Sequence, residues 1–398
     1  MAVSAIDRVT QPSTLLCASN YSSDVGFAWD FIGKLWAGIG DKVAVAGVRT
    51  VVAYPSIPVP PYTLHYSLAK AIVLDATFHR LRSVISVLKY VRKANVRYVY
   101  LTDRPVVSIA YLFLRAIGVK RIIVHDHTSG ERTKPSGLKR WVKWVIARLP
   151  LINADDVICV SDYVARRQIE VGLVPPTRVK RVWNGLPIQE IGQASIHEML
   201  NIDPERPVII CACRASRVKG VEYLLSAFEK LCDRLPPSDS RPVLVYVGGG
   251  PEFKNLELIR DSLRSKDDII FTGYRNDVLK LLLGAQICVV PSVWQDACPL
   301  SVLEPMSLGR AVVASAVGGI PEIIDNGVTG KLVPPADPSA LSEAILDLLT
   351  NKEQCERLGL AARIRIERDF GIERQVNKLA EIIISQPAHA SPWSDPSR

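Results

Sequence analysis

Short apolar runs alternate with helical stretches along most of this chain. In the first half they lie at residues 14–19, 42–48, 97–101, 121–125 and 156–160, and in the second half at residues 207–213, 243–247, 287–290 and 311–315. Strands that alternate with helices predict a parallel sheet covered by helices on both faces. A chain of 398 residues has room for two such units, so we expect an α/β protein with two Rossmann-like domains. Ligands then gather at the carboxyl ends of the strands.

The segment after the apolar run at residues 287–290 predicts a nucleotide site. A loop holds Asp296, and the helical run that follows places Glu304 one turn beyond Leu300 and Ser301. The start of a helix presents unpaired backbone N–H groups, which bind phosphate, and a carboxylate one turn further accepts two hydrogen bonds from a ribose diol. One helix would therefore hold both ends of a nucleoside diphosphate. The alternative is that Asp296 and Glu304 are ordinary solvated charges.

Two loops upstream add groups that suit a diphosphate. The apolar run at residues 207–213 is followed by Arg214 and Lys219, cations that suit an anionic ligand. Gly248 and Gly250 follow the next run and let a backbone approach a ligand closely. Each loop taken alone has a plainer explanation, as surface cations at a strand end or as an ordinary glycine turn.

Aromatic and imidazole side chains also follow predicted strands. Tyr274 comes after an apolar run and is a candidate to stack on a nucleobase, although an aromatic residue at a strand end is more often part of the core. His125 and His127 lie at the end of the run at residues 121–125, and alternation along a strand points both imidazoles to the same side. Their spacing also suits metal ligands, but the pattern offers no third ligand.

These motifs together resemble the retaining glycosyltransferases of family 4, which have the GT-B fold. That family has two acidic residues separated by seven others, then a small residue, a glycine, a basic residue and a Gly-Gly-x-Pro-Glu loop. The matching residues here are Asp296, Glu304, Ser307, Gly309, Arg310 and residues 318–322. The resemblance implies two domains that face each other across a cleft. It also implies transfer of a hexosyl unit from a nucleoside-diphosphate sugar to a hydroxyl of a glycan, lipid or small molecule, with retention and without a metal.

The resemblance implies roles for individual residues of the second half. Arg214 and Lys219 would clamp the diphosphate, together with the helix start at Leu300. Glu304 would hold the ribose, and Asp296 would hold the donor sugar.

In the first half, the family has a histidine at the reacting face of the sugar, and we assign this role to His125, with His127 as the competitor. Tyr274 would lie near the base, and Gly26 would contact phosphate from the opening loop.

Four positions depart from the family pattern. Asp296 stands where the family usually has Glu, Cys213 where it has Gly, and Pro305 where a helix interior would have Ala. Gly26 stands alone where the family usually has two adjacent glycines. These departures support a competing hypothesis, a catalytically silent GT-B protein that acts as a partner or membrane-docking subunit of another transferase. A nonhydrolysing sugar epimerase on the same fold is a third hypothesis.

The motifs divide the chain into two domains and a tail. We expect an acceptor-side domain at residues 1–188, a nucleotide-sugar domain at residues 189–370, a helix at residues 373–385 that returns to the first domain, and a disordered tail at residues 386–398. Asn184 and Gly185, just before the boundary, suit a tight turn that needs positive φ.

Positive charge is concentrated in the acceptor half. The first 200 residues contain 26 Lys and Arg against 14 Asp and Glu, whereas the other residues contain 23 against 26. Residues 137–152 combine cations with Trp141 and Trp144, which predicts a basic amphipathic helix of the kind that rests on an anionic membrane surface. The alternative is that both tryptophans pack into the core. Nucleic acid is not an expected partner because no nucleic-acid module is visible.

The eight cysteines lie mostly in apolar runs without zinc-type spacing, which favours reduced thiols in a cytoplasmic protein. Cys211 and Cys213 would share one face of their strand, a poor arrangement for a disulfide. No basic region followed by a long apolar stretch predicts a signal peptide, and prolines interrupt the apolar residues 51–66. We therefore expect a cytoplasmic protein. The basic amphipathic helix adds the expectation that it is peripheral on the inner face of the cell membrane.

Overall fold

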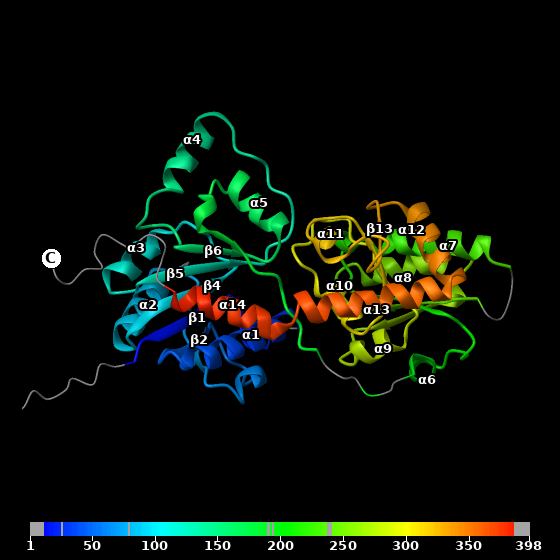
Figure 1. Ribbon diagram of the computed structural model, residues 1–398, viewed down its shortest axis with the longest axis horizontal. Helices are drawn as coiled ribbons and strands as arrows, with labels where there is room; N and C mark the ends of the chain where they lie inside the picture. The colour runs from blue at the N-terminus through cyan, green and yellow to red at the C-terminus, as the bar shows by residue number, and fades with distance from the viewer. Residues whose placement is uncertain are drawn as a thin grey trace, which may run out of the picture.

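The structure is a computed structural model that describes residues 12–24, 27–78, 80–188, 192, 195–236 and 241–385. Two α/β domains lie side by side (Figure 1). The first contains a seven-stranded sheet in the order β3-β2-β1-β4-β5-β6-β7, and the second a six-stranded sheet in the order β10-β9-β8-β11-β12-β13. All paired neighbours are parallel. Counted from its own first strand, each sheet begins 3-2-1-4-5-6, so the prediction of two Rossmann-like domains is confirmed.

The strands are short, as the apolar runs predicted. The first sheet contains β1 (Thr14–Ala18), β2 (Arg49–Tyr54), β3 (Lys70–Val73), β4 (Val96–Thr102), β5 (Arg121–Asp126), β6 (Asp156–Cys159) and β7 (Val179–Arg181). The second contains β8 (Val208–Ala212), β9 (Val243–Val247), β10 (Ile269–Gly273), β11 (Ile287–Val290), β12 (Ala311–Ser315) and β13 (Lys331–Val333).

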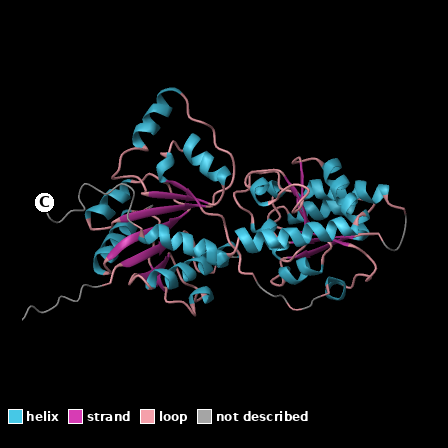
Figure 2. Cartoon of the chain, in the orientation of Figure 1, coloured by secondary structure: helices cyan, strands magenta, loops and turns pink. Residues whose placement is uncertain are grey.

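Helices cover both faces of each sheet (Figure 2). The first domain contains α1 (Phe27–Ala44), α2 (Leu81–Lys93), α3 (Ile109–Ala116), α4 (Gly137–Ile146), α5 (Asp162–Glu170) and the short 3-10 helix η1 (Tyr62–Leu64). The second contains α6 (Ile196–Leu200), α7 (Val221–Arg234), α8 (Phe253–Ser262), α9 (Val278–Gly284), α10 (Leu300–Ser307), α11 (Ile320–Ile323), α12 (Pro338–Thr350) and α13 (Lys352–Asp369). Helix α14 (Ile372–Ile384) follows the second domain in sequence.

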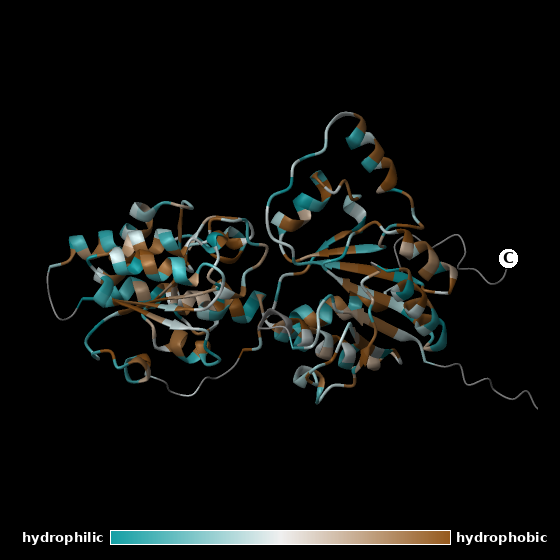
Figure 3. Ribbon diagram, turned by 180° about the vertical axis from the view of Figure 1, so that it is seen from behind, coloured by the Kyte–Doolittle hydropathy of each residue, from teal (hydrophilic) through white to brown (hydrophobic). Residues whose placement is uncertain are grey.

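Strand periodicity decides which residues meet which layer of helices. Along β1, Leu15 and Cys17 belong to the core on the side of α1, whereas Leu16 and Ala18 belong to the core on the opposite side. All of β1 is buried, because a central parallel strand has helices on both faces. In Figure 3 the strands are accordingly among the most hydrophobic elements of both domains.

Helix α14 lies on the first domain although it is the last element of the chain (Figure 1). It packs on α1, and Val376, Leu379 and Ile383 join the same apolar core as Trp36. A Cβ atom on Gly38 would lie 2.8 Å from Val376 Cγ2, so the glycine lets the two helices approach closely. The first domain is therefore completed by a segment from the other end of the chain.

One strand prediction is wrong. Residues 42–48 are not a strand, because α1 extends to Ala44 and β2 begins only at Arg49. Val43 and Val48 are both buried, the first as the end of the apolar face of a helix and the second as the entry to β2. The buried end of α1 and the buried entry to β2 lie close together in sequence, so their apolar residues resemble a single strand. Gly47, at φ 73°, makes the turn between them.

Candidate functional site

The carboxyl ends of the two sheets meet at the boundary between the domains. The loop after β5 contacts the loop after β11, where the backbone N–H of Gly130 donates to the carbonyl of Gln295 at 2.7 Å. Gly130 has φ 95°, and a Cβ atom there would lie 2.5 Å from Nε1 of Trp294. Only glycine fits this position without displacing the indole, so the close contact between the domains depends on it.

Glu322 ties the second domain to the first. Its two carboxylate oxygens accept hydrogen bonds from the backbone N–H groups of Asp162 and Tyr163, each at 2.7 Å. These donors belong to the first turn of α5, where N–H groups lack helical partners and the helix dipole favours a negative charge. The Gly-Gly-x-Pro-Glu motif was found in the sequence without a role for Glu322, because its partners lie about 160 residues away.

Lys219 and Asp296 are ion-paired. Lys219 Nζ lies 2.8 and 2.9 Å from the two carboxylate oxygens of Asp296. The Asp296 side chain is 10% exposed and that of Lys219 is 22% exposed, so the pair is partly shielded from water. The sequence predicted separate roles for the two residues, on the diphosphate and on the donor sugar. Their contact brings the cation predicted for the diphosphate and the carboxylate predicted for the donor sugar together at the domain boundary.

Arg214 lies on a loop held by glycine contacts. It is exposed and makes no ion pair with any described residue. A Cβ atom on Gly248 would overlap the carbonyl oxygen of Cys213, and one on Gly250 would lie 2.5 Å from that of Ala215. The sequence predicted that Gly248 and Gly250 let the backbone approach a ligand closely. In the structure these glycines let it approach the loop that carries Arg214.

Cys213 fits the loop without a left-handed backbone, since it is not among the described residues with positive φ. Its sulfur lies 3.8 Å from that of Cys211, and both thiols are free, in agreement with the prediction that they form no disulfide.

The start of α10 presents donors without partners. Pro299 caps the helix with no side-chain hydrogen bond. The first backbone N–H groups that find an acceptor are those of Val302 and Leu303, so those of Leu300 and Ser301 have none among the described residues. An anion is the natural acceptor for such groups at a helix start.

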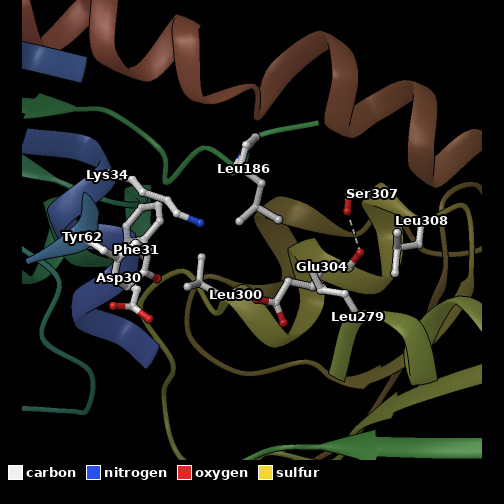
Figure 4. A pocket seen from close by; sticks show the side chains of 11 residues that line it. Asp30, Phe31, Lys34, Tyr62, Leu186, Leu279, Leu300, Glu304, Ser307 and Leu308 are labelled. Atoms are coloured by element: carbon white, nitrogen blue, oxygen red, sulfur yellow. Dashed lines mark hydrogen bonds between the residues drawn. The ribbon is translucent and has the colours of Figure 1, made fainter. Parts of the chain in front are cut away.

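Glu304 lies one turn further along α10, in a pocket between the domains (Figure 4). The pocket is lined from α10 by Leu300, Glu304, Ser307 and Leu308, from α9 by Leu279, and from the first domain by Asp30, Phe31, Lys34, Tyr62, Leu186 and Pro187. Burial raises the pKa of Glu304 to about 8, and Lys34 opposes this shift. A carboxyl with this pKa is mainly protonated at neutral pH until a ligand supplies partners.

Tyr274 is 69% exposed, so the alternative that it belongs to the core is wrong. Tyr62 of the first domain is close enough for electrostatic interaction with it. Burial and the Asp30 carboxylate raise the pKa of Tyr62 to about 12. Tyr62, Asp30 and Lys34 were not predicted as site residues. The one available signal was the pair of charges at Asp30 and Lys34, four residues apart in the otherwise apolar residues 27–40 of this helix.

The two histidines lie on one side of β5, with ring centroids 4.0 Å apart. His125 is 0% exposed, and its Nδ1 shares a hydrogen bond with the hydroxyl of Tyr100. Burial first, and His127 second, lower the pKa of His125 well below its ordinary value.

His127 is partly exposed and packs edge-on against Phe31, which lines the pocket. The burial of His125 and the exposure of His127 favour His127 as the histidine that meets a ligand.

Two predicted features, the phosphate contact of Gly26 and the tail at residues 386–398, lie outside the described residues. The positive φ expected at Asn184 and Gly185 is wrong, since neither has it. Asn184 is buried and donates to the carbonyl of Cys298 at 3.0 Å, while a Cβ atom on Gly185 would lie 2.8 Å from the carbonyl oxygen of Gly371. Both residues serve contact between segments where the chain crosses between domains.

Helix α4 projects from the first domain and buries none of its residues (Figure 1). Trp141 is 62% exposed and Trp144 is 46% exposed, so the alternative that they pack into the core is wrong. Arg148 lies over the ring of Trp144, with its guanidinium carbon 3.9 Å from the ring centroid. Figure 3 shows hydrophobic and hydrophilic residues together on this helix.

No helix in the described part of the chain combines the length and hydrophobicity needed to cross a bilayer. The described residues also contain no cluster of three or more His, Cys, Asp or Glu arranged to hold a metal ion.

Two glycosyltransferase family models match the chain, one in each half. Residues 40–190 match the family described as Glycosyltransferase Family 4, and residues 192–365 match the family described as Glycosyl transferases group 1. N-acetyl-alpha-D-glucosaminyl L-malate synthase of Bacillus anthracis is 28% identical over 60% of this chain and 61% of its own length. A GDP-mannose-dependent alpha-(1-6)-phosphatidylinositol monomannoside mannosyltransferase of Mycolicibacterium smegmatis is 27% identical over 63% of this chain and 66% of its own length. This chain therefore matches less than two thirds of the length of either relative.

Solved structures extend the likeness over nearly the whole chain. The Anabaena protein HepE in complex with UDP and glucose superimposes with a TM-score of 0.75, at 19% identity, over 93% of this chain and 99% of that protein. At this identity the match establishes the fold.

Proposed function

The chain belongs to the family 4 glycosyltransferases with the GT-B fold, and we propose that it transfers a hexosyl unit from a nucleoside-diphosphate sugar to an acceptor hydroxyl. The observation that carries the proposal is the face of α10 at the domain boundary. It presents free N–H groups at Leu300 and Ser301 and a carboxyl one turn further at Glu304. A nucleoside diphosphate has anionic oxygens and a ribose diol at the spacing of these two kinds of partner.

The loops around α10 supply groups for the chemical step. Lys219 and Arg214 stabilise the diphosphate as it leaves, because its charge grows as the glycosyl bond breaks. Asp296, held by Lys219, accepts hydrogen bonds from hydroxyls of the donor sugar. His127 contacts the reacting face, with His125 and Tyr100 packed behind it. Tyr274 stacks on the base.

The reaction proceeds with retention and without a metal ion. Both features come from the family resemblance, and each has a direct test. Proton NMR of the product reports the anomeric configuration, and inversion would overturn the first feature. Turnover unchanged by excess EDTA supports the second, and loss of turnover that Mg²⁺ or Mn²⁺ restores would overturn it.

The decisive experiment is donor hydrolysis by the purified protein. A screen of UDP, GDP and ADP sugars by thermal shift selects the donor, and release of nucleoside diphosphate is then followed without an acceptor. Slow release that Glu304→Gln diminishes supports a transferase. Binding without any release, with or without glycan and lipid acceptors, would support the silent-subunit hypothesis, which the transferases among the relatives do not favour.

A second observation, the exposed helix α4, favours a lipid-linked acceptor. We propose that α4 rests on an anionic membrane surface, with Trp141 and Trp144 at the headgroup level and Lys139 and Arg140 beside phosphate groups. Exposed tryptophans among cations suit such an interface, because the rings have an apolar body and a polar edge. The protein would then be peripheral on the inner face of the cell membrane, with its acceptor in the lipid or carried by it.

A further inference from the structure

The pocket that holds Glu304 has one wall from each domain. Residues of α10 and α9 form one wall, and of these the sequence predicted Leu300 and Glu304 as site residues. The opposite wall belongs to the first domain, where Asp30, Lys34 and Tyr62 are its polar residues beside the apolar Phe31, Leu186 and Pro187 (Figure 4). No role for this wall follows from the motifs of the second half, which all lie on the other side.

Lys34 is the cation of this wall. Figure 4 shows its ammonium group directed into the pocket, near Leu300 and Leu186. No ion pair or hydrogen bond with a described residue occupies it, although it is close enough to Glu304 to lower the pKa of that carboxyl. A cation in this position has unused hydrogen-bonding capacity toward a ligand.

The location of Lys34 selects the part of the ligand that it meets. The free N–H groups at Leu300 suit the outer phosphate, and Glu304 suits the ribose. The phosphate attached directly to the ribose must lie between these two points, where the Lys34 ammonium is directed. Tyr62 lines the same pocket and lies close enough to Tyr274 to interact with it electrostatically across the boundary, so a base stacked on Tyr274 would lie near Tyr62.

We propose that two further residues of the first domain belong to the donor site, with Lys34 bound to the phosphate next to the ribose and Tyr62 packed against the base opposite Tyr274. This inference rests on the proposed function and names the residues through which the nucleotide joins the two domains. One ligand held by α1 and α10 together stabilises the contact between the domains, to which the Glu322 cap on α5 also contributes.

The test uses the full chain and isothermal titration calorimetry with UDP and GDP. Lys34→Ala is expected to weaken binding of the preferred diphosphate on the order of tenfold, the loss typical of one hydrogen bond to a charged group. Tyr62→Ala is expected to weaken it by a similar factor. Lys42→Ala, on the same helix outside the pocket, and Tyr66→Ala, an exposed tyrosine of the same loop region, are the matched controls and bind as wild type.

Free nucleosides separate the two contacts. Uridine or guanosine lacks phosphate, so Lys34→Ala leaves its binding unchanged while Tyr62→Ala weakens it. Equal loss of nucleoside and diphosphate affinity in Lys34→Ala would overturn the phosphate assignment.

Glu304→Gln separates this inference from the function on which it rests. Weaker diphosphate binding in Glu304→Gln, with wild-type binding in Lys34→Ala and Tyr62→Ala, overturns the inference and leaves the proposed function intact. Wild-type binding in all three variants overturns both. Thermal unfolding of each variant confirms that it is folded, and Tyr62→Leu, which removes the aromatic ring but keeps apolar bulk, replaces Tyr62→Ala if the latter is not.

Discussion

Lys219 Nζ contacts both carboxylate oxygens of Asp296, at 2.8 and 2.9 Å, across 77 residues of sequence. A donor that binds Lys219 through phosphate and Asp296 through sugar hydroxyls therefore meets a pair that is already positioned. Asp296 stands where the family usually has Glu, and its side chain is one methylene shorter. Lys219 holds the shorter carboxylate at the boundary.

The first prediction concerns this pair. Lys219→Ala and Arg214→Ala are each expected to reduce turnover on the order of a hundredfold or more, since each removes a group that acts on a charge growing in the transition state. The double variant Lys219→Ala with Asp296→Asn is expected to reduce turnover by less than the product of the two single fold reductions, because either single change already breaks the pair. Arg264→Ala, which breaks an exposed pair with Asp233, is the control and leaves turnover unchanged. Full activity of Lys219→Ala would remove the pair from the mechanism.

The second prediction concerns the protonation of Glu304. With a pKa of about 8, this carboxyl is mainly protonated at pH 7, and the ribose diol binds best to the ionised form. Binding of a nucleoside diphosphate at pH 7 should therefore release protons, and its affinity should increase as the pH rises from 7 to 9. The phosphates contribute little, because they are already ionised in this range. Calorimetry in two buffers of different ionisation enthalpy measures the release. Glu304→Gln should show weaker, pH-independent binding, and the same proton release in this variant would contradict the assignment.

The third prediction separates the two histidines. His127→Ala is expected to reduce turnover on the order of a hundredfold with little loss of stability, because the side chain is partly exposed at the boundary. Tyr100→Phe leaves buried His125 without its hydrogen-bond partner, which costs about 1–3 kcal/mol of the free energy of unfolding. The unfolded chain protonates His125 near pH 6.5 and the folded chain resists protonation, so the unfolded state binds more protons and stability falls as the pH drops below 6.5. Urea unfolding and steady-state rates measure both effects. Loss of activity without loss of stability in His125→Asn would restore His125 as the active histidine.

The fourth prediction concerns the contact between domains. Glu322→Ala removes the carboxylate that accepts from Asp162 and Tyr163, and the loss of a helix cap costs about 1 kcal/mol. Because this cap also joins the domains, the radius of gyration by small-angle X-ray scattering should increase without ligand and decrease again with nucleoside diphosphate. Glu343→Ala, at an exposed position of α12, is the control. An unchanged radius of gyration in both variants would show that Glu322 does not hold the domains together.

The fifth prediction concerns helix α4. The protein is expected to bind phosphatidylglycerol vesicles more strongly than phosphatidylcholine vesicles, and added salt should weaken this binding by screening. Lys139→Gln combined with Arg140→Gln should lower vesicle binding and leave donor hydrolysis intact. Lys143 is left unchanged because its ammonium donates to the carbonyl of Val171 at 2.7 Å and so supports the fold.

The control for the fifth prediction is the equal charge change Lys230→Gln with Lys254→Gln in the second domain. Sedimentation with vesicles is the measurement. Equal partitioning of both double variants and wild type would leave α4 without a membrane role and favour a soluble acceptor.

Motifs confined to a few turns of chain were predictable because their geometry is local. The strand β11, the loop with Asp296 and the helix with Leu300 and Glu304 follow each other directly, so hydrophobic periodicity and helix spacing were enough to place them. The first half was harder. At residues 42–48 the end of α1 and the entry to β2 are both apolar, and no local signal separates a buried helix end from a short buried strand.

The sequence by itself determined the two parallel sheets, the face of α10 that suits a nucleotide, and the concentration of charge in the first half. These depend on periodicity, on spacing within one element and on composition. Only the tertiary structure decided that Lys219 is paired with Asp296, that Tyr100 and His125 are buried together, that Glu322 caps α5, and that Lys34 and Tyr62 face Glu304. Each of these joins residues distant in sequence, and their distance is set by how sheets, helices and domains pack, which no single segment encodes.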